Sequence, residues 1–283
     1  MLNANEAFRK LINSIWPIQG SEVIPVSEAH GRFTATDIAA PMDLPPFKSS
    51  AMDGYAVSTS KLNTVIPFKM NVIGESRAGH PSSDRVSGRN AIRIFTGAVI
   101  PSGADAVVLQ ENVDRVGNTI NVNELPHPGD HIRARGHDIK EQDMIVPAGT
   151  LLDAYRLSWL TACGIPSVDV KPRVSVAIFS TGDELADVGS PLAEGQIYDS
   201  NRFALSTLMS DQPINLIDVG RLPDDPDEIR SNLQSVAGEA DMLVTSGGVS
   251  VGDSDFVKDI VAEIGRIDFW NIALKPRKPL AVG

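Results

Sequence analysis

One segment, an apolar run followed by a glycine-rich loop and a helical pattern, constrains this chain most. Met242, Leu243 and Val244 read as a buried strand, and SGGVSVGDSD follows at residues 246–255. Apolar residues then recur on one helical face at residues 256–264. Strand, glycine loop and helix in this order predict an anion cradle. Glycines let the backbone approach the ligand closely, and the N–H groups of the first helical turn point at it.

An acidic residue in this loop narrows the kind of anion site. Gly247 and Gly252 have the spacing of a phosphate loop, but Asp253 stands where a nucleotide-hydrolysing loop needs lysine. A carboxylate there repels phosphate unless a cation lies between them. The loop therefore predicts an anion with a divalent metal, and it argues against an ATPase and a dinucleotide site. A tight turn that only packs the helix on its strand explains the same residues.

Two further strands are expected to end in acidic loops. The apolar run at residues 174–180 leads into TGDEL, and the run at residues 214–219 leads to Asp224, Asp225 and Pro226. Ligands of open α/β sheets bind at the carboxyl ends of the strands, so we expect the loops after the three strands to form one rim. Its carboxylates are expected to be Asp183 or Glu184, Asp224, and Asp253 or Asp255. Asp225 alternatively caps a helix that begins at Pro226, which leaves Asp224 for the rim.

Two lysines follow an expected strand at residues 267–273. Lys275 and Lys278 lie in the run LKPRKP, where the prolines fix the backbone and present the side chains stiffly. We expect both lysines to hold an oxyanion, although isolated surface lysines usually only confer solubility.

Seven motifs occur along the chain in a fixed order. They are SAMDGYAV at 50–57, IRIFTGAVIP at 92–101, RxRGxD at 133–138, FSTGDEL at 179–185, QIYDSN at 196–201, SGGVSVGD at 246–253 and KPxKP at 275–279. Together they resemble the molybdopterin molybdenumtransferase family, which includes the E domain of gephyrin, over essentially the whole chain. The resemblance implies insertion of molybdate into adenylylated molybdopterin with release of AMP, dependent on Mg²⁺, in an elongated homodimer whose active clefts each need two chains.

The residues and the resemblance together give a set of expected site residues. Those expected to act in catalysis are Asp53, Glu184, Asp224, Asp255, Lys275 and Lys278. Those expected to bind substrate are Thr96, Asp138, Thr181, Gly182, Ser246, Gly247, Gly248 and Ser250, and the expected Mg²⁺ ligands are Asp224 and Asp255.

Three of the motifs also have plain structural interpretations. Asp53-Gly54 is a typical hairpin signal, and Thr96-Gly97 after an apolar run is a turn by itself. The RxRGxD motif, with Arg133, Arg135 and Asp138, is either a solvated loop or an anion-facing edge of the same cleft.

The order of apolar runs and turn residues along the chain predicts a multidomain α/β plus β protein. Short apolar runs broken by turn residues indicate an inserted β-barrel-like domain at 46–144, and alternating strands and helices indicate a parallel α/β domain, of the molybdopterin-binding type, at 172–283. Residues 1–45 and 145–171 are expected to form an elongated connecting and dimerisation layer. It begins with a capped amphipathic helix whose apolar residues are Phe8, Leu11, Ile12, Ile15 and Trp16.

Composition limits partners and compartment. The 283 residues carry a formal net charge of −11, so we expect no nucleic-acid surface, and no apolar run approaches membrane-spanning length. The single cysteine, Cys163, forms no internal disulfide and is expected to be a buried structural thiol in a cytoplasmic protein. By resemblance, the expected partners are a second copy, the molybdopterin adenylyltransferase and maturation proteins of molybdoenzymes.

The chain departs from the family pattern in several places. Asn271 replaces a lysine, Arg277 replaces the glycine of KPGKP, and His137 replaces an acidic residue. The chain also stops before the family's GLPGNPVS-like loop and C-terminal β domain, so we expect a truncated product. A non-catalytic molybdopterin-binding or scaffolding role, or a molybdopterin adenylyltransferase, remain alternative functions.

Overall fold

The computed structural model describes residues 2–62, 65–248, 256–270, 272–273 and 281–283. The chain divides into two compact units. The first comprises residues 1–24, 29–35 and 169–283, and the second comprises residues 25–28 and 36–168. The finer division into a connecting layer and an inserted domain remains a prediction.

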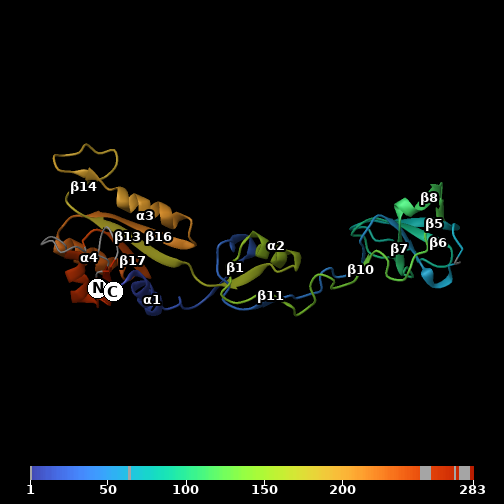
Figure 1. The fold of residues 1–283 in the computed structure, drawn as a ribbon, viewed down its shortest axis with the longest axis horizontal. Helices are drawn as coiled ribbons and strands as arrows, with labels where there is room; N and C mark the ends of the chain where they lie inside the picture. Colours follow the sequence, from blue (N-terminus) through green and yellow to red (C-terminus); the bar gives the residue numbers. More distant parts are fainter. Residues whose placement is uncertain (1, 63–64, 249–255, 271, 274–280) are drawn as a thin grey trace. The chain divides into compact units, whose positions relative to one another are not determined.

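A three-stranded parallel sheet organises the first unit (Figure 1). Its order is β16 (Ile214–Leu222), β13 (Val174–Thr181) and β17 (Met242–Ser246), with β13 in the centre. Five residues in a row of β13 are buried before Thr181, as expected for a strand covered on both faces. The three expected strands are confirmed as parallel neighbours. The expected burial of the run at residues 242–244 is wrong, because Met242 and Leu243 are exposed on β17, which is an edge strand of this sheet in the described residues.

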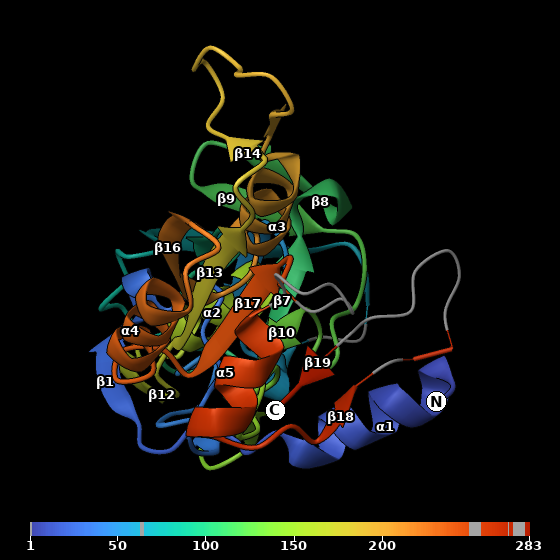
Figure 2. The same cartoon turned by 90° about the vertical axis from the view of Figure 1, so that its left-hand side faces the viewer.

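Helices cover both faces of this sheet. Helix α3 (Ser200–Ser210) lies on one face, and α4 (Pro226–Val236) and α5 (Phe256–Ile264) lie on the other (Figures 1 and 2). The core beneath α4 and α5 joins apolar side chains of the sheet and of these two helices, namely Phe179, Leu222, Ile229, Leu233, Val257 and Ile260. Asp225 caps α4 and Pro226 stands in its first turn, so the predicted capping role of Asp225 is confirmed.

The end of the first unit differs from the sequence prediction. The strand expected at residues 267–273 is reduced to β18 (Phe269–Trp270), which pairs antiparallel with β19 (Ala281–Val282). Ile272 instead forms a single parallel bridge with Leu2, next to the N-terminal helix. In the described residues, this segment packs against that helix and pairs with no strand of the parallel sheet.

Helix α1 (Ala4–Ser14) begins with the predicted capping box, in which Asn3 and Glu6 exchange hydrogen bonds. The predicted apolar face is only partly correct. Ala7 is buried and Leu11 packs beside Phe269, Ile272 and Val282, whereas the other apolar side chains are exposed. These are Phe8, Ile12, Ile15 and Trp16. The helix also ends at Ser14, before Ile15 and Trp16, so its buried apolar face is smaller than the sequence predicts.

A six-stranded mixed sheet forms most of the second unit. Its order is β7 (Ala106–Leu109), β4 (Gly54–Val57), β6 (Asn90–Ile94), β5 (Phe68–Ser76), β9 (Thr119–Val122) and β8 (Val113–Val116). All neighbours are antiparallel except β5 and β6. Side chains of β4 alternate between two cores, with Tyr55 and Val57 in one and Ala56 in the other. The expected barrel is not closed in the described residues, because β7 and β8 are edges of this sheet.

The interpretation of Asp53-Gly54 as a hairpin turn is wrong. Gly54 is the first residue of β4, whose partners are β6 and β7, whereas β3 (Ser49–Ser50) pairs with β10 (Ile132–Arg133). A Cβ added at Gly54 would lie 2.0 Å from the carbonyl oxygen of Val108. Glycine is therefore needed for close approach of a neighbouring strand and not for a turn conformation. Gly117, with a φ of +61°, instead lies in the turn of a hairpin formed by β8 and β9.

The remaining elements are short. They are β1 (Glu22–Pro25), η1 (Val26–Glu28), β2 (Ile38–Ala39), η2 (Thr59–Lys61), η3 (Gln110–Asn112), β11 (Met144–Val146), α2 (Ala154–Ala162), β12 (Ser167–Val170), β14 (Leu185–Ala186) and β15 (Ile197–Tyr198). Cys163 ends α2 and is buried, as predicted, and burial raises the pKa of its thiol. A raised pKa keeps the sulfur protonated and disfavours a nucleophilic role.

Candidate functional site

The carboxyl edge of the parallel sheet brings several predicted site residues together. Thr181 ends the central strand β13, and Ser246 ends β17, one register position away, where Ser180 pairs with Ser246. Gly182 follows with a φ of +144°, a conformation that strongly favours glycine. The loops after two parallel strands therefore begin side by side, which is where an open α/β sheet binds its ligand.

The glycines of the loop after β17 lie directly on Thr181. A Cβ at Gly247 would lie 2.8 Å from the carbonyl oxygen of Thr181, and one at Gly248 would lie 3.0 Å from its Oγ1. Both glycines also have positive φ values, +112° and +69°. Glycine is therefore needed at both positions for close packing against Thr181, and the predicted close approach to a ligand remains a prediction.

Two acidic loops meet at the same edge. The backbone N–H of Asp183 donates to the carboxylate of Asp224 at 3.4 Å, and the N–H of Asp224 donates back to the carboxylate of Asp183 at 3.3 Å. These bonds are long, but their reciprocity places two carboxylates from the loops after β13 and β16 beside each other. Glu184 is exposed in the same loop, and its side chain lies against Gly182. Sequence reasoning had left Asp183 and Glu184 as alternatives, and Asp183 is the one bonded to Asp224.

Four predicted site residues lie outside the described residues. They are Ser250, Asp255, Lys275 and Lys278. The departures at Asn271 and Arg277 also lie there. The roles expected for these residues remain predictions.

In the second unit, the predicted pair Asp53 and Thr96 is brought together. Oδ1 of Asp53 accepts the backbone N–H of Thr96 at 2.8 Å and its hydroxyl at 3.0 Å. These two hydrogen bonds lower the pKa of Asp53 below its ordinary value, with a smaller contribution from the charge of Arg93. Asp53 is therefore a fixed, ionised carboxylate near neutral pH.

Sequence reasoning missed Arg93, which supports this pair. Its guanidinium lies 5.0 Å from the ring centre of Tyr55 and 4.8 Å from that of Phe95. It also donates to the carbonyl oxygen of Gly54 at 3.0 Å, next to Asp53. A charged residue between the apolar positions 92 and 94 of an expected strand was the available signal.

The RxRGxD motif forms an ion-paired loop. Arg133 donates to both oxygens of Asp138 at 2.7 Å, and Arg135 donates to Asp43 at 2.6 Å. All three residues of the motif are exposed, while Gly136 is buried at φ +67°. Both arginines already hold a carboxylate, so the geometry matches the solvated-loop interpretation at least as well as the anion-binding one.

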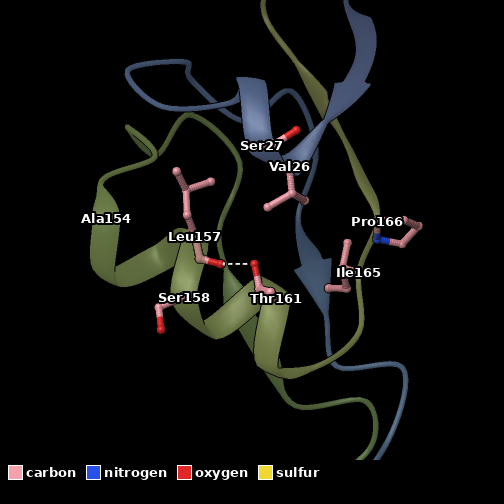
Figure 3. A pocket seen from close by; sticks show the side chains of 8 residues that line it. All are labelled: Val26, Ser27, Ala154, Leu157, Ser158, Thr161, Ile165 and Pro166. Atoms are coloured by element: carbon pink, nitrogen blue, oxygen red, sulfur yellow. Dashed lines mark hydrogen bonds between the residues drawn. The ribbon is translucent and has the colours of Figure 1, made fainter.

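A separate hollow of about 460 Å³ lies between η1 and α2 (Figure 3). Its walls are largely apolar: Val26, Ser27, Ala154, Leu157, Ser158, Thr161, Ile165 and Pro166. None of the predicted site residues lines it, and it presents no charged side chain to an anionic ligand. Within the described parts of the chain, no group of three acidic, His or Cys side chains is arranged to hold a metal ion. No helix in those parts is long and apolar enough to span a membrane.

Comparison with known protein families accounts for nearly the whole chain. Residues 2–164 match "MoeA N-terminal region (domain I and II)", and residues 177–283 match "Probable molybdopterin binding domain".

Individual relatives agree with these matches. The chain is 41% identical over all its length to the molybdopterin molybdenumtransferase of Haemophilus influenzae, and it spans 70% of that protein. It is 38% identical over 93% of its length to that of a Nostoc species, and it spans 62% of that protein. The crystal structure of a molybdopterin biosynthesis moeA protein from Pyrococcus horikoshii OT3 matches the whole chain with a TM-score of 0.85 and 32% identity, and 72% of that protein is covered.

Proposed function

The chain belongs to the molybdopterin molybdenumtransferase family, and we propose that it inserts molybdate into adenylylated molybdopterin with release of AMP. The observation that supports this most is the sheet edge where Thr181, Gly182, Gly247 and Gly248 meet. Close backbone contact at this edge makes a preorganised site for a phosphate-bearing ligand.

The chemical problem of this reaction is charge repulsion. Molybdate is a dianion, and the adenylylated substrate carries a pyrophosphate, so both must be held by donors in one site. We assign backbone N–H groups of the two loops and the hydroxyl of Ser246 to the phosphates. Lys275 and Lys278 are assigned to the molybdate oxygens, where fixed cations offset the repulsion. Water attack on the pyrophosphate breaks its P–O–P linkage, which releases AMP and leaves a phosphate on molybdopterin. The two dithiolene sulfurs bind molybdenum, and one molybdate oxygen leaves as water with the two thiol protons.

The residues at the sheet edge fit a magnesium ion. Asp183 and Asp224 place two carboxylates together, and Mg²⁺ binds through one or two carboxylates plus substrate phosphates rather than through a cage of protein ligands. When bound, it would neutralise charge on the pyrophosphate. Asp255, from the glycine loop, is the second ligand that the sequence predicts beside Asp224.

We further propose that the active cleft is shared in a cytoplasmic homodimer. Asp53 and Thr96 belong to the second unit, whereas the glycine loops belong to the first. Family resemblance supports their meeting across a two-fold axis. The ionised, fixed carboxylate of Asp53 would then face the substrate held by the partner chain.

A single assay tests the proposed reaction. Purified chain is mixed with adenylylated molybdopterin and molybdate, and AMP release and molybdenum incorporation are measured together. We expect molybdate-dependent AMP release that needs Mg²⁺, and a Lys275→Ala variant about a hundredfold slower, as for loss of one oxyanion donor. Lys69→Ala, at an exposed position of β5, is the matched control and should keep full activity.

Light scattering on the same samples measures the oligomeric state. A strictly monomeric protein with full activity would contradict the shared cleft. A dimer that binds substrate but releases no AMP would favour a non-catalytic binding role.

A further inference from the structure

A buried carboxylate lies directly behind the proposed site. Asp199 precedes α3, and its side chain is only 2% exposed. Its Oδ2 accepts the hydroxyl of Ser180 at 2.5 Å and Nε of Arg202 at 3.0 Å, while Oδ1 accepts the backbone N–H of Arg202 at 3.1 Å. Three donors from a strand and a helix therefore converge on one side chain.

Arg202 keeps this carboxylate charged. The same guanidinium donates to both oxygens of Asp218 on β16 at 2.8 Å, and to Asp187 at 3.2 Å. Burial acts to raise the pKa of Asp199, but the hydrogen bonds from Ser180 and Arg202 outweigh it, so the pKa lies below the ordinary value. Asp199 is thus an ion at neutral pH, held inside the protein.

Capping alone does not explain an ion at this position. A serine or asparagine caps a helix as well as aspartate does, without the cost of burying a charge. The second carboxylate oxygen accepts the hydrogen bond from Ser180, which links the start of α3 to the last residues of the central strand. A charge-assisted bond of this length is stronger and more directional than one between neutral groups.

Ser180 is the last residue before the site. It is fully buried and pairs with Ser246 on one side and Arg221 on the other. Thr181 follows it, and Thr181 is the residue against which Gly247 and Gly248 pack. A shift of Ser180 therefore moves Thr181, and with it the glycine loop.

We propose that Asp199 is a positioning residue, which fixes the end of β13 through the hydroxyl of Ser180 and thereby sets the geometry of the Thr181 and Gly247-Gly248 loops for substrate. Its effect on catalysis rests on the proposed function, whereas its effect on loop geometry does not. Arg202 holds Asp199 in the required ionised state and orientation.

Hydrogen exchange tests the positioning without reference to the reaction. Ser180→Ala removes only the one hydroxyl, leaving the cap and the Arg202 pair. We expect amide exchange of residues 181–186 to rise about tenfold, equivalent to 1.4 kcal/mol and at the low end for a bond to a charged group, with α4 unchanged. Asp187→Asn is the matched control, since Asp187 also contacts Arg202 but is 65% exposed, and it should leave these amides unaffected.

A kinetic measurement separates positioning from a purely structural role. Ser180→Ala should raise KM for adenylylated molybdopterin about tenfold at nearly constant kcat, because the binding loops are looser while the reacting groups are kept. Asp199→Asn should raise KM by at least as much, because the NH₂ group of the new amide would face a donor N–H of Arg202. If this variant does not fold, Ser180→Ala alone decides the question.

Two results would overturn the inference: exchange at residues 181–186 no faster than in Asp187→Asn, or faster exchange spread evenly over the first unit. If the wild-type chain fails to bind adenylylated molybdopterin, the proposed function is wrong, and the exchange data still decide the role of Asp199.

Discussion

Replacing Gly54 by alanine tests the account of the second unit most sharply. The added Cβ would lie 2.0 Å from the carbonyl oxygen of Val108 and 2.9 Å from its carbonyl carbon. Both are backbone atoms of the neighbouring strand β7, which pairs with β4 from Gly54 to Val57. The clash cannot be relieved by a side-chain rotation, so the two strands must separate.

The size of the effect follows from that separation. Ordinary contact begins near 3.4 Å, so the strands must part by more than 1 Å. Overpacking of this kind costs about 1–3 kcal/mol, and one weakened backbone hydrogen bond adds about 1 kcal/mol. We expect a loss of about 3 kcal/mol, which lowers the melting temperature by about 6–12 °C for a unit of this size.

Scanning calorimetry of Gly54→Ala measures this directly, with an uncrowded glycine of the first unit as a control for the substitution itself. Gly238→Ala is the control, because Gly238 has no positive φ and its nearest neighbour, the carbonyl oxygen of Ser235, would be 3.7 Å away. It should be neutral or slightly stabilising. If Gly54→Ala melts within 2 °C of the control, about the shift for 0.5–1 kcal/mol, the close-approach explanation of Gly54 is refuted.

Three further predictions concern the site and its supports. Thr96→Val removes the hydroxyl donor and should raise the pKa of Asp53 toward its ordinary value, measured by carboxyl NMR; an unchanged pKa would mean that the hydroxyl bond is absent in solution. Gly248→Ala places a Cβ 2.4 Å from Cγ2 of Val257 at a φ of +69° and should cost about 2–4 kcal/mol in urea unfolding; wild-type stability would contradict this contact. Because folding depresses the pKa of Asp199, the stability that it contributes is complete above the ordinary value of 3.8 and is lost as the pH falls through the folded pKa. Asp199→Asn should therefore make the unfolding free energy of the first unit less dependent on pH below 4. An unchanged pH dependence in this variant would exclude Asp199 as a source of acid sensitivity.

The sequence was most informative where the period of apolar residues is unambiguous. The runs at residues 174–180 and 242–244 were predicted as strands within a few residues. Burial on both faces explains the continuous apolar run of β13, whereas Met242 and Leu243 of β17 are exposed. Asp225-Pro226 and Asn3 with Glu6 also specify their helix starts locally, by hydrogen bonds between near neighbours.

Predictions failed where distant contacts decide the structure. Asp53-Gly54 has the local signature of a hairpin, yet Gly54 is required by strand β7, which lies more than fifty residues further along the chain. The apolar stripe of α1 likewise continued to Trp16 in sequence, while its burial is set by Phe269 and Ile272 near the other end of the chain. Propensity carries no information about such partners.

The candidate site was predictable in part. Thr181, Gly182, Gly247 and Gly248 were identified from glycine loops after strands, and their residues lie together in the first unit. Asp53 and Thr96 were identified from motifs, and they are hydrogen-bonded to each other in the second unit. Arg93 and the bond between Ser180 and Asp199 were not predicted, because cross-strand stacking and a buried ion depend on register and on side-chain direction.

Calorimetric titration of the wild-type chain with adenylylated molybdopterin, with and without Mg²⁺, tests the central claim most directly. Ser246→Ala, at the edge of the parallel sheet, serves as the site variant. We predict saturable binding that requires Mg²⁺ and is weakened about tenfold in Ser246→Ala, as for loss of one charge-assisted hydrogen bond. Binding of equal strength without Mg²⁺ and in Ser246→Ala, or no binding at all, would contradict the assignment of this sheet edge as the substrate site.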